Sequence, residues 1–138
     1  MVHKLVRTAR QAPVLVAVAE SSPQPHRARL EKAGCEVLVC PGTTHGERLD
    51  ALLTELGRCK MTNILVEGGA QLLGCLFDAN LVDEVHAFIA LKLIGGATAP
   101  GPIAGQGRAL MSQAIALDAP EVTTVGDDVY ICGRVARR

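Results

Sequence analysis

The stretch that decides the fold is "NILVEGGAQLLGCLFDANLVDEV", residues 63–85. Residues 63–68 are rich in Ile, Leu and Val, and this run predicts a strand that ends beside Glu67. Gly68 and Gly69 follow and predict a tight turn. Residues 70–80 then place leucines on one face at helical spacing, which predicts a helix packed against a sheet. A strand, a glycine turn and a helix in this order form the repeating unit of an α/β protein.

The same alternation extends outward from this stretch in both directions. Two upstream segments and one downstream segment predict further strands, at residues 12–18, 35–40 and 83–91. One helix is predicted between the two upstream strands, at residues 24–33. Another is predicted after the second of these strands, in the leucine-rich run that ends at Gly57. Ser22 and Thr44 are the predicted caps of these helices. The resulting βαβαβαβ order favours a three-layer α/β/α fold with a mainly parallel sheet.

The last third of the chain has a different pattern. Residues 92–107 are rich in Gly, Pro and Ala, and a segment of this length without a helix or strand pattern predicts a functional loop over a site. Two β-prone runs then flank Gly126 and predict a C-terminal antiparallel hairpin. No repeat or linker divides the sequence, so residues 1–138 are expected to form one domain.

Composition limits the classes of function. Fourteen basic and fourteen acidic residues cancel, and one Tyr, two Phe and no Trp provide no platform for stacking bases, so nucleic-acid binding is not expected. No apolar run is long enough to predict a membrane span. The five cysteines have no metal-site spacing, and stretches such as "GCEVLVC" and "VYICG" predict buried strand positions for them. We therefore expect free thiols, no bound metal and a reducing, cytoplasmic location.

The turn after residue 66 allows two interpretations. Gly68 and Gly69 are either plain turn residues, or they let a phosphate approach bare backbone amides at the start of the next helix. Glu67 is either a solvated acid at a strand end or a group that forms hydrogen bonds with hydroxyl or amine groups of a second ligand. Gly74, in mid-helix, costs about 1 kcal/mol relative to Ala and indicates close packing or a nearby ligand. Spacing alone leaves these alternatives open.

The segment "NILVEGGAQLLGCLFDANLVDEVHAFIALKLIGG" resembles the reductase domain of bacterial riboflavin biosynthesis, usually the C-terminal half of a bifunctional deaminase–reductase of the RibD or RibG type. The upstream "VLVAVAES", "LEKAGCEVLVCP" and the terminal "VGDDVYICGRV" are also similar to that family, so the resemblance covers most of the chain. The resemblance implies a dihydrofolate-reductase-like fold.

The resemblance also implies an activity: reduction by NADPH of the ribosyl side chain of 5-amino-6-(5-phosphoribosylamino)uracil, a phosphorylated aminopyrimidine, to the ribityl form. On that pattern Glu67 contacts the substrate. Seven residues at the start of the helix line the cofactor pocket, namely Gly69, Ala70, Gln71, Leu72, Leu73, Gly74 and Cys75. Ser21, just past the first strand, reaches the adenosine 2′-phosphate or belongs to a helix cap. A homodimer is expected by the same resemblance, and no catalytic residue is assigned.

The sequence departs from the family at its start. The family's opening strands and helices, with a "K.A.SLDG"-like motif and Arg- and Asp-bearing motifs, are not found here, so the chain is expected to be an N-terminally truncated form of the domain. The alternative function is a non-catalytic domain that retains nucleotide binding or serves in homo-oligomer assembly through exposed strand edges. An ordinary Rossmann dehydrogenase is disfavoured, because "AESSPQP" after the first strand has no glycine fingerprint.

Overall fold

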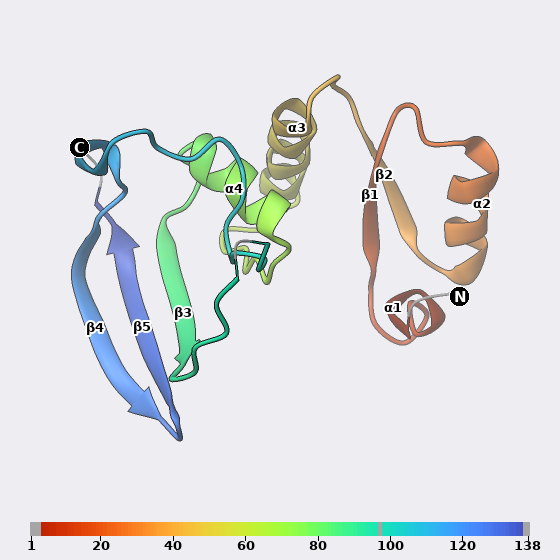
Figure 1. Cartoon of the computed structure of the whole chain (residues 1–138). Helices are drawn as coiled ribbons and strands as arrows, with labels where there is room; N and C mark the ends of the chain where they lie inside the picture. Colours follow the sequence, from red (N-terminus) through yellow and green to blue (C-terminus); the bar gives the residue numbers. More distant parts are fainter. Residues whose placement is uncertain (1–3, 97, 137–138) are drawn as a thin grey trace. The chain divides into compact units, whose positions relative to one another are not determined.

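The computed structural model describes residues 4–96 and 98–136, and it consists of two compact units whose boundary falls between Leu65 and Val66. Each unit has a sheet of its own, and the first is formed by the earlier strands of the chain (Figure 1). The α/β class predicted from the sequence is confirmed, with parallel strands early in the chain and antiparallel strands at its end. One domain over residues 1–138 stays a prediction.

The first unit is a βαβ arrangement with two further helices. Its elements are α1 (Lys4–Arg7), β1 (Leu15–Ala19), α2 (Gln24–Ala33), β2 (Glu36–Cys40) and α3 (His45–Arg58). β1 and β2 pair in parallel, from Leu15 opposite Glu36 to Ala19 opposite Cys40. The helix predicted at residues 24–33 is confirmed, and both predicted strands are present with shifted bounds.

The two longer helices of the first unit begin in different ways. α3 begins with a capping box, in which the Glu47 N–H donates to Thr44 Oγ1 at 3.2 Å and the Thr44 N–H donates to the Glu47 carboxylate at 3.0 Å. Hydrogen bonds from the N–H groups of Thr44 and Thr43 lower the pKa of Glu47. The predicted Ser22 cap is wrong, because Pro23 occupies the cap position of α2 and no side chain caps that helix.

The second unit is built around its last strand. Its elements are α4 (Ala70–Asp78), β3 (Glu84–Ala90), the 3₁₀ turn η1 (Met111–Gln113), β4 (Leu117–Val125) and β5 (Asp128–Val135). β5 lies between β3 and β4 and pairs antiparallel with both, as Figure 1 shows. The predicted fourth strand and the predicted C-terminal hairpin around Gly126 are therefore confirmed.

The strand predicted at residues 63–68 is wrong. This segment has no regular structure, and Ile64 and Leu65 are exposed. A β-prone run forms a strand only when a neighbouring strand pairs with its N–H and C=O groups. No strand among the described residues pairs with this segment, so parallel pairing is limited to β1 and β2.

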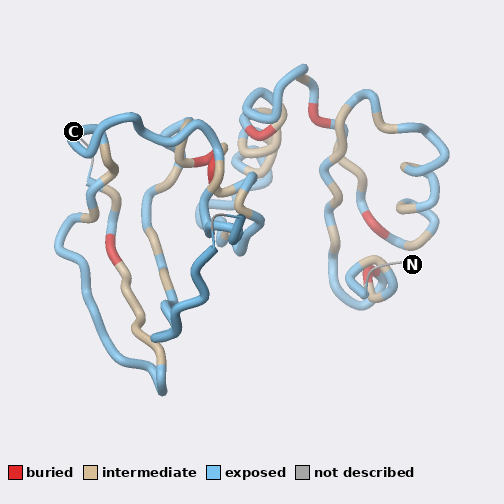
Figure 2. The backbone as a smooth tube through the Cα atoms, in the orientation of Figure 1, coloured by how far each residue is buried: buried red, intermediate tan, exposed pale blue. Residues whose placement is uncertain are grey.

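Each unit buries few side chains completely (Figure 2). The buried apolar residues are Ala9, Cys35, Cys40 and Leu49 in the first unit and Leu76 in the second. The prediction of buried strand positions for the cysteines fails for Cys59, which is exposed and follows the last residue of α3, and for Cys75, which is half-buried in α4. All five thiols are free. Within residues 4–96 and 98–136, no helix combines the length and the apolar character that crossing a bilayer requires.

We expect Thr44→Ala to lower the free energy of unfolding by about 1 kcal/mol, because it removes the side-chain acceptor of the α3 capping box. Thr54→Ala is the matched control, since Thr54 is exposed in the interior of the same helix and Ala has the higher helix propensity. Urea unfolding followed by circular dichroism measures both variants. An equal loss of stability in the two variants would contradict the capping role.

Candidate functional site

The glycine turn before α4 has a backbone conformation that depends on glycine. Gly68 has a φ of +101° and Gly69 a φ of +64°, values that residues with a Cβ rarely adopt. A Cβ built on either residue would meet no atom within 4 Å. The conformation thus requires glycine for φ, and the space in front of it is open.

Among the described residues, no side chain caps the N-terminus of α4. Gly69 is the cap residue, no side chain accepts a hydrogen bond from the first turn, and the first turn contains no acidic residue. The first amide groups of a helix lack intrahelical acceptors, and the aligned peptide dipoles place partial positive charge there. An uncapped, open helix start of this kind favours an anionic ligand such as a phosphate.

Glu67 lies immediately before the glycine pair. Its side chain is exposed, and within the described part of the chain its carboxylate has no hydrogen-bond or ion-pair partner. A free carboxylate next to a site for anions is unfavourable for binding a phosphate directly beside it. It is suited to accept hydrogen bonds from hydroxyl or amine groups of another ligand.

The seven residues that the sequence assigns to a cofactor form one continuous segment, from Gly69 through the second turn of α4. The exposed part of this segment is its first turn, where Gln71 and Leu72 face solvent. Gly74 is buried, and Leu73 and Cys75 are half-buried. Ser21 belongs to the first unit and lies exposed in the turn after β1. The binding roles of these residues stay predictions.

Gly74 is in contact with the loop of residues 92–107. A Cβ at this position would overlap the carbonyl of Ala104 and would lie 2.6 Å from the backbone nitrogen of Gly105. The Ala104 N–H also donates to the carbonyl oxygen of Ala70 at 3.0 Å. Close packing against protein therefore explains the glycine in mid-helix.

Asp78 and Arg108 fasten the end of this loop to the end of α4. The Asp78 carboxylate accepts hydrogen bonds from the N–H of Gln106 at 2.7 Å and of Gly107 at 3.2 Å. Arg108 Nη2 donates to the Phe77 carbonyl oxygen at 3.2 Å, and it also donates to Asn80 Oδ1 at 2.8 Å. The C-terminal carbonyls of α4 thereby gain the cationic partner that a helix end favours.

An open hollow of about 240 Å³ lies beside the end of α4 and is lined by Phe77, Ile103, Arg108 and Ile115 among others. Pockets that enclose a drug-sized ligand usually measure roughly 300–1,000 Å³. This hollow is smaller than such pockets.

The sequence does not reveal the roles of Asp78 and Arg108. Their partners are 28 to 31 residues away along the chain, and neither position belongs to a helix-stop or turn signal. The loop itself was the available signal, because a long Gly- and Pro-rich segment must be held by side chains outside it.

The sequence model of the RibD C-terminal domain family matches residues 2–131. Riboflavin biosynthesis protein RibD of Actinobacillus pleuropneumoniae is 31% identical over 128 residues, which are 93% of this chain and 34% of that protein. The 2,5-diamino-6-ribosylamino-4(3H)-pyrimidinone 5′-phosphate reductase of Methanothermobacter thermautotrophicus is 34% identical over 121 residues, 88% of this chain and 55% of that protein. The chain thus spans between about a third and about half of the length of these relatives.

Solved structures with the same fold include a pyrimidine reductase-like protein from Corynebacterium diphtheriae, with a TM-score of 0.67, 21% identity and coverage of 90% of this chain and 50% of that one. RibD of Acinetobacter baumannii gives a TM-score of 0.68 at 21% identity, covering 88% of this chain and 31% of that chain. These similarities confirm the α/β, dihydrofolate-reductase-like fold predicted from the sequence, and the family match confirms the resemblance on which that prediction rested.

We expect Gly74→Ala to destabilise the chain by about 1–3 kcal/mol, because the new methyl group overlaps the backbone of the loop and forces it away from α4. Gly57→Ala, in α3, is the control. A Cβ there meets nothing within 4 Å, and the substitution is expected to stabilise by about 0.5–1 kcal/mol. Chemical unfolding measures both changes, and opposite signs are the expected result. Stabilisation by both substitutions would show that the loop does not press on Gly74.

Proposed function

The chain belongs to the RibD C-terminal domain family, and on that premise we propose that it is the NADPH-binding reductase part of a riboflavin-biosynthesis enzyme. The proposed reaction reduces the ribosyl side chain of 5-amino-6-(5-phosphoribosylamino)uracil to the ribityl form. A relative named for reduction of a closely related ribosylaminopyrimidine phosphate supports this substrate class. The structural observation that carries the proposal is the open, uncapped start of α4 behind two left-handed glycines.

The residues at the start of α4 fit the anionic part of the proposed cofactor. The absence of any atom within 4 Å of a Cβ built on Gly69 means that a diphosphate can approach the backbone there without meeting a side chain. The N–H groups of Ala70, Gln71 and Leu72 supply donors from the first turn. In this proposal the remaining cofactor residues on α4 shape the rest of the pocket, and a contact of the Ser21 hydroxyl with the adenosine 2′-phosphate stays a prediction from the family resemblance.

Glu67 has a different part in the proposal. An exposed carboxylate without a protein partner is a strong acceptor for ribosyl hydroxyl or aminopyrimidine amine groups. It also disfavours a substrate phosphate at the same spot by charge repulsion. We therefore assign Glu67 to orienting the neutral, hydrogen-bonding side of the substrate while its phosphate lies elsewhere.

The nicotinamide of NADPH supplies the hydride that reduces C1′ of the ribosyl group. The chain has to hold that carbon at the correct distance from the cofactor and exclude competing orientations, because the cofactor carries the chemistry. Glu67 and the first turn of α4 are adjacent in the chain, so the proposed substrate contact and the proposed cofactor contacts come from one short segment.

A homodimer in the cytoplasm completes the proposal. Three apolar side chains at the end of β3 and in the following loop are strongly exposed, namely Leu91, Leu93 and Ile94. Covering them with a second copy would remove apolar surface from water. Five free cysteines are in keeping with a reducing compartment. Light scattering on the purified chain tests the dimer.

We expect Gly69→Ala to weaken NADPH binding about tenfold or more, because the methyl group enters the space reserved for the phosphate. Gly126→Ala is a matched control. Gly126 has a φ of +60°, close to the +64° of Gly69, and a Cβ there also meets nothing within 4 Å, so it tests an alanine at the same positive φ away from the proposed site. Fluorescence titration with NADPH compares the two variants, with circular dichroism to verify folding. Equal affinities of the two variants for NADPH would show that the cofactor does not bind at the start of α4.

We expect Glu67→Gln to lower kcat/KM for the aminopyrimidine substrate roughly 10- to 100-fold, the usual loss for a charge-assisted hydrogen bond, and to leave NADPH affinity unchanged. NADPH oxidation is followed spectroscopically with the substrate present, and the assay is repeated with its 2,5-diamino analogue. Glu31→Gln, an exposed acid in α2, controls for loss of surface charge. NADPH binding without turnover of either substrate would favour the alternative of a non-catalytic domain.

A further inference from the structure

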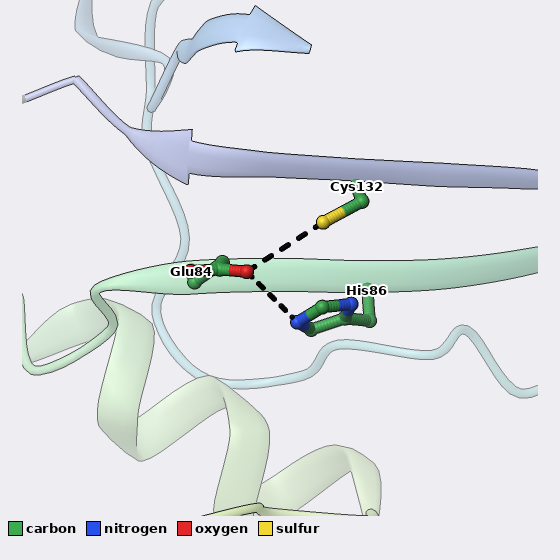
Figure 3. A group of neighbouring side chains, drawn as sticks. All are labelled: Glu84, His86 and Cys132. Carbon is green, nitrogen blue, oxygen red and sulfur yellow. Dashed lines mark hydrogen bonds and ion pairs between the residues drawn. The ribbon is translucent and has the colours of Figure 1, made fainter. Parts of the chain in front are cut away.

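Three different metal-ligating side chains meet on one face of the second sheet. Glu84 and His86 are two residues apart in β3, so their side chains point to the same face. Cys132 of β5 is directly opposite His86 in the antiparallel ladder. Figure 3 shows the Glu84 carboxylate between the imidazole and the thiol. One ligand atom from each residue lies within 4.8 Å of the other two.

The measured separations agree with those of ligands around a tetrahedral ion. Glu84 Oε1 lies 3.1 Å from His86 Nε2 and 3.6 Å from Cys132 Sγ. With ordinary bond lengths to zinc, tetrahedral ligands are about 3.3 Å apart for an oxygen–nitrogen pair and about 3.5 Å apart for an oxygen–sulfur pair. The third separation, between His86 Nε2 and Cys132 Sγ, is within 4.8 Å, so an ion at the centre would draw the imidazole and the thiol closer together.

Neighbouring side chains hold two of these groups in a binding orientation. The Tyr130 hydroxyl lies 2.6 Å from His86 Nδ1, so the Nδ1–H can donate to it and leave the Nε2 lone pair directed at Glu84. Arg134 Nε lies 3.9 Å from Glu84 Oε2, the oxygen that faces away from His86.

We propose that Glu84, His86 and Cys132 form a binding site for a divalent transition-metal ion of the zinc class, with water as the fourth ligand. A thiolate and an imidazole together select zinc or cobalt(II) over magnesium or calcium, which prefer oxygen ligands. The site ties β3 to β5, and it keeps an open position because three protein ligands converge within the described part of the chain. Glu84 and His86 are somewhat over 40% exposed, so the ion can exchange with solvent. The proposal is independent of the proposed reductase function.

Cobalt(II) titration of the purified chain tests the ligand set, because a cobalt–thiolate bond produces a charge-transfer band and tetrahedral cobalt produces visible absorption. We expect both signals in the parent chain and in Cys59→Ser, an exposed cysteine outside the site. Cys132→Ser should abolish the charge-transfer band. Tyr130→Phe removes a hydrogen-bond partner of the ligand His86, and it should weaken metal binding by roughly 10- to 100-fold. His86→Gln and Glu84→Gln remove the ligands themselves and should weaken metal binding by more than this.

Thiol protection gives a second test that needs no substitution. The exposed Cys59 should be alkylated by iodoacetamide with or without zinc, whereas Cys132 should be protected only when zinc is present. Cys40 provides an internal reference, since burial raises the pKa of its thiol and slows its reaction in both conditions. Mass spectrometry locates the labels. Equal labelling of Cys132 with and without zinc, or a cobalt spectrum unchanged in Cys132→Ser, would overturn the site and leave a metal-free histidine–glutamate pair.

Discussion

The backbone of Ala104 and Gly105 lies directly against Gly74, and the position of the long Gly- and Pro-rich loop depends on this contact. A loop of this composition has few side chains with which to pack, and its free backbone groups need partners. The Ala70 carbonyl provides one partner at the start of α4, and Asp78 provides two at its end. The chain continues from this loop through η1 into β4.

The two ends of α4 differ in what is available to a ligand. At the C-terminal end, Arg108 already donates to the Phe77 carbonyl, so the negative end of the helix dipole has a protein partner. At the N-terminal end, Gly69 provides no side chain, and no other side chain caps the first turn. An anion is therefore favoured at one end only, next to Glu67. The proposed phosphate site at the glycine turn rests on this asymmetry.

β5 determines which distant residues become neighbours. It pairs with β3 on one side and β4 on the other, and its antiparallel register places Cys132 opposite His86. A shift of one residue would move Cys132 to the opposite face of the sheet, away from Glu84 and His86. Those residues came together through strand pairing and not through local sequence spacing, which predicts no metal site.

The sequence by itself determined the elements whose causes are local. The cap of α3 at Thr44 and the turn at Gly68 and Gly69 each involve residues no more than a few positions apart, and both are seen in the structure. Tertiary structure alone decided why position 74 must be glycine, what Asp78 binds and that residues 63–68 do not form a strand. The physical reason is that helix caps and turns satisfy backbone groups within one segment, whereas strands and loop contacts require partners tens of residues away.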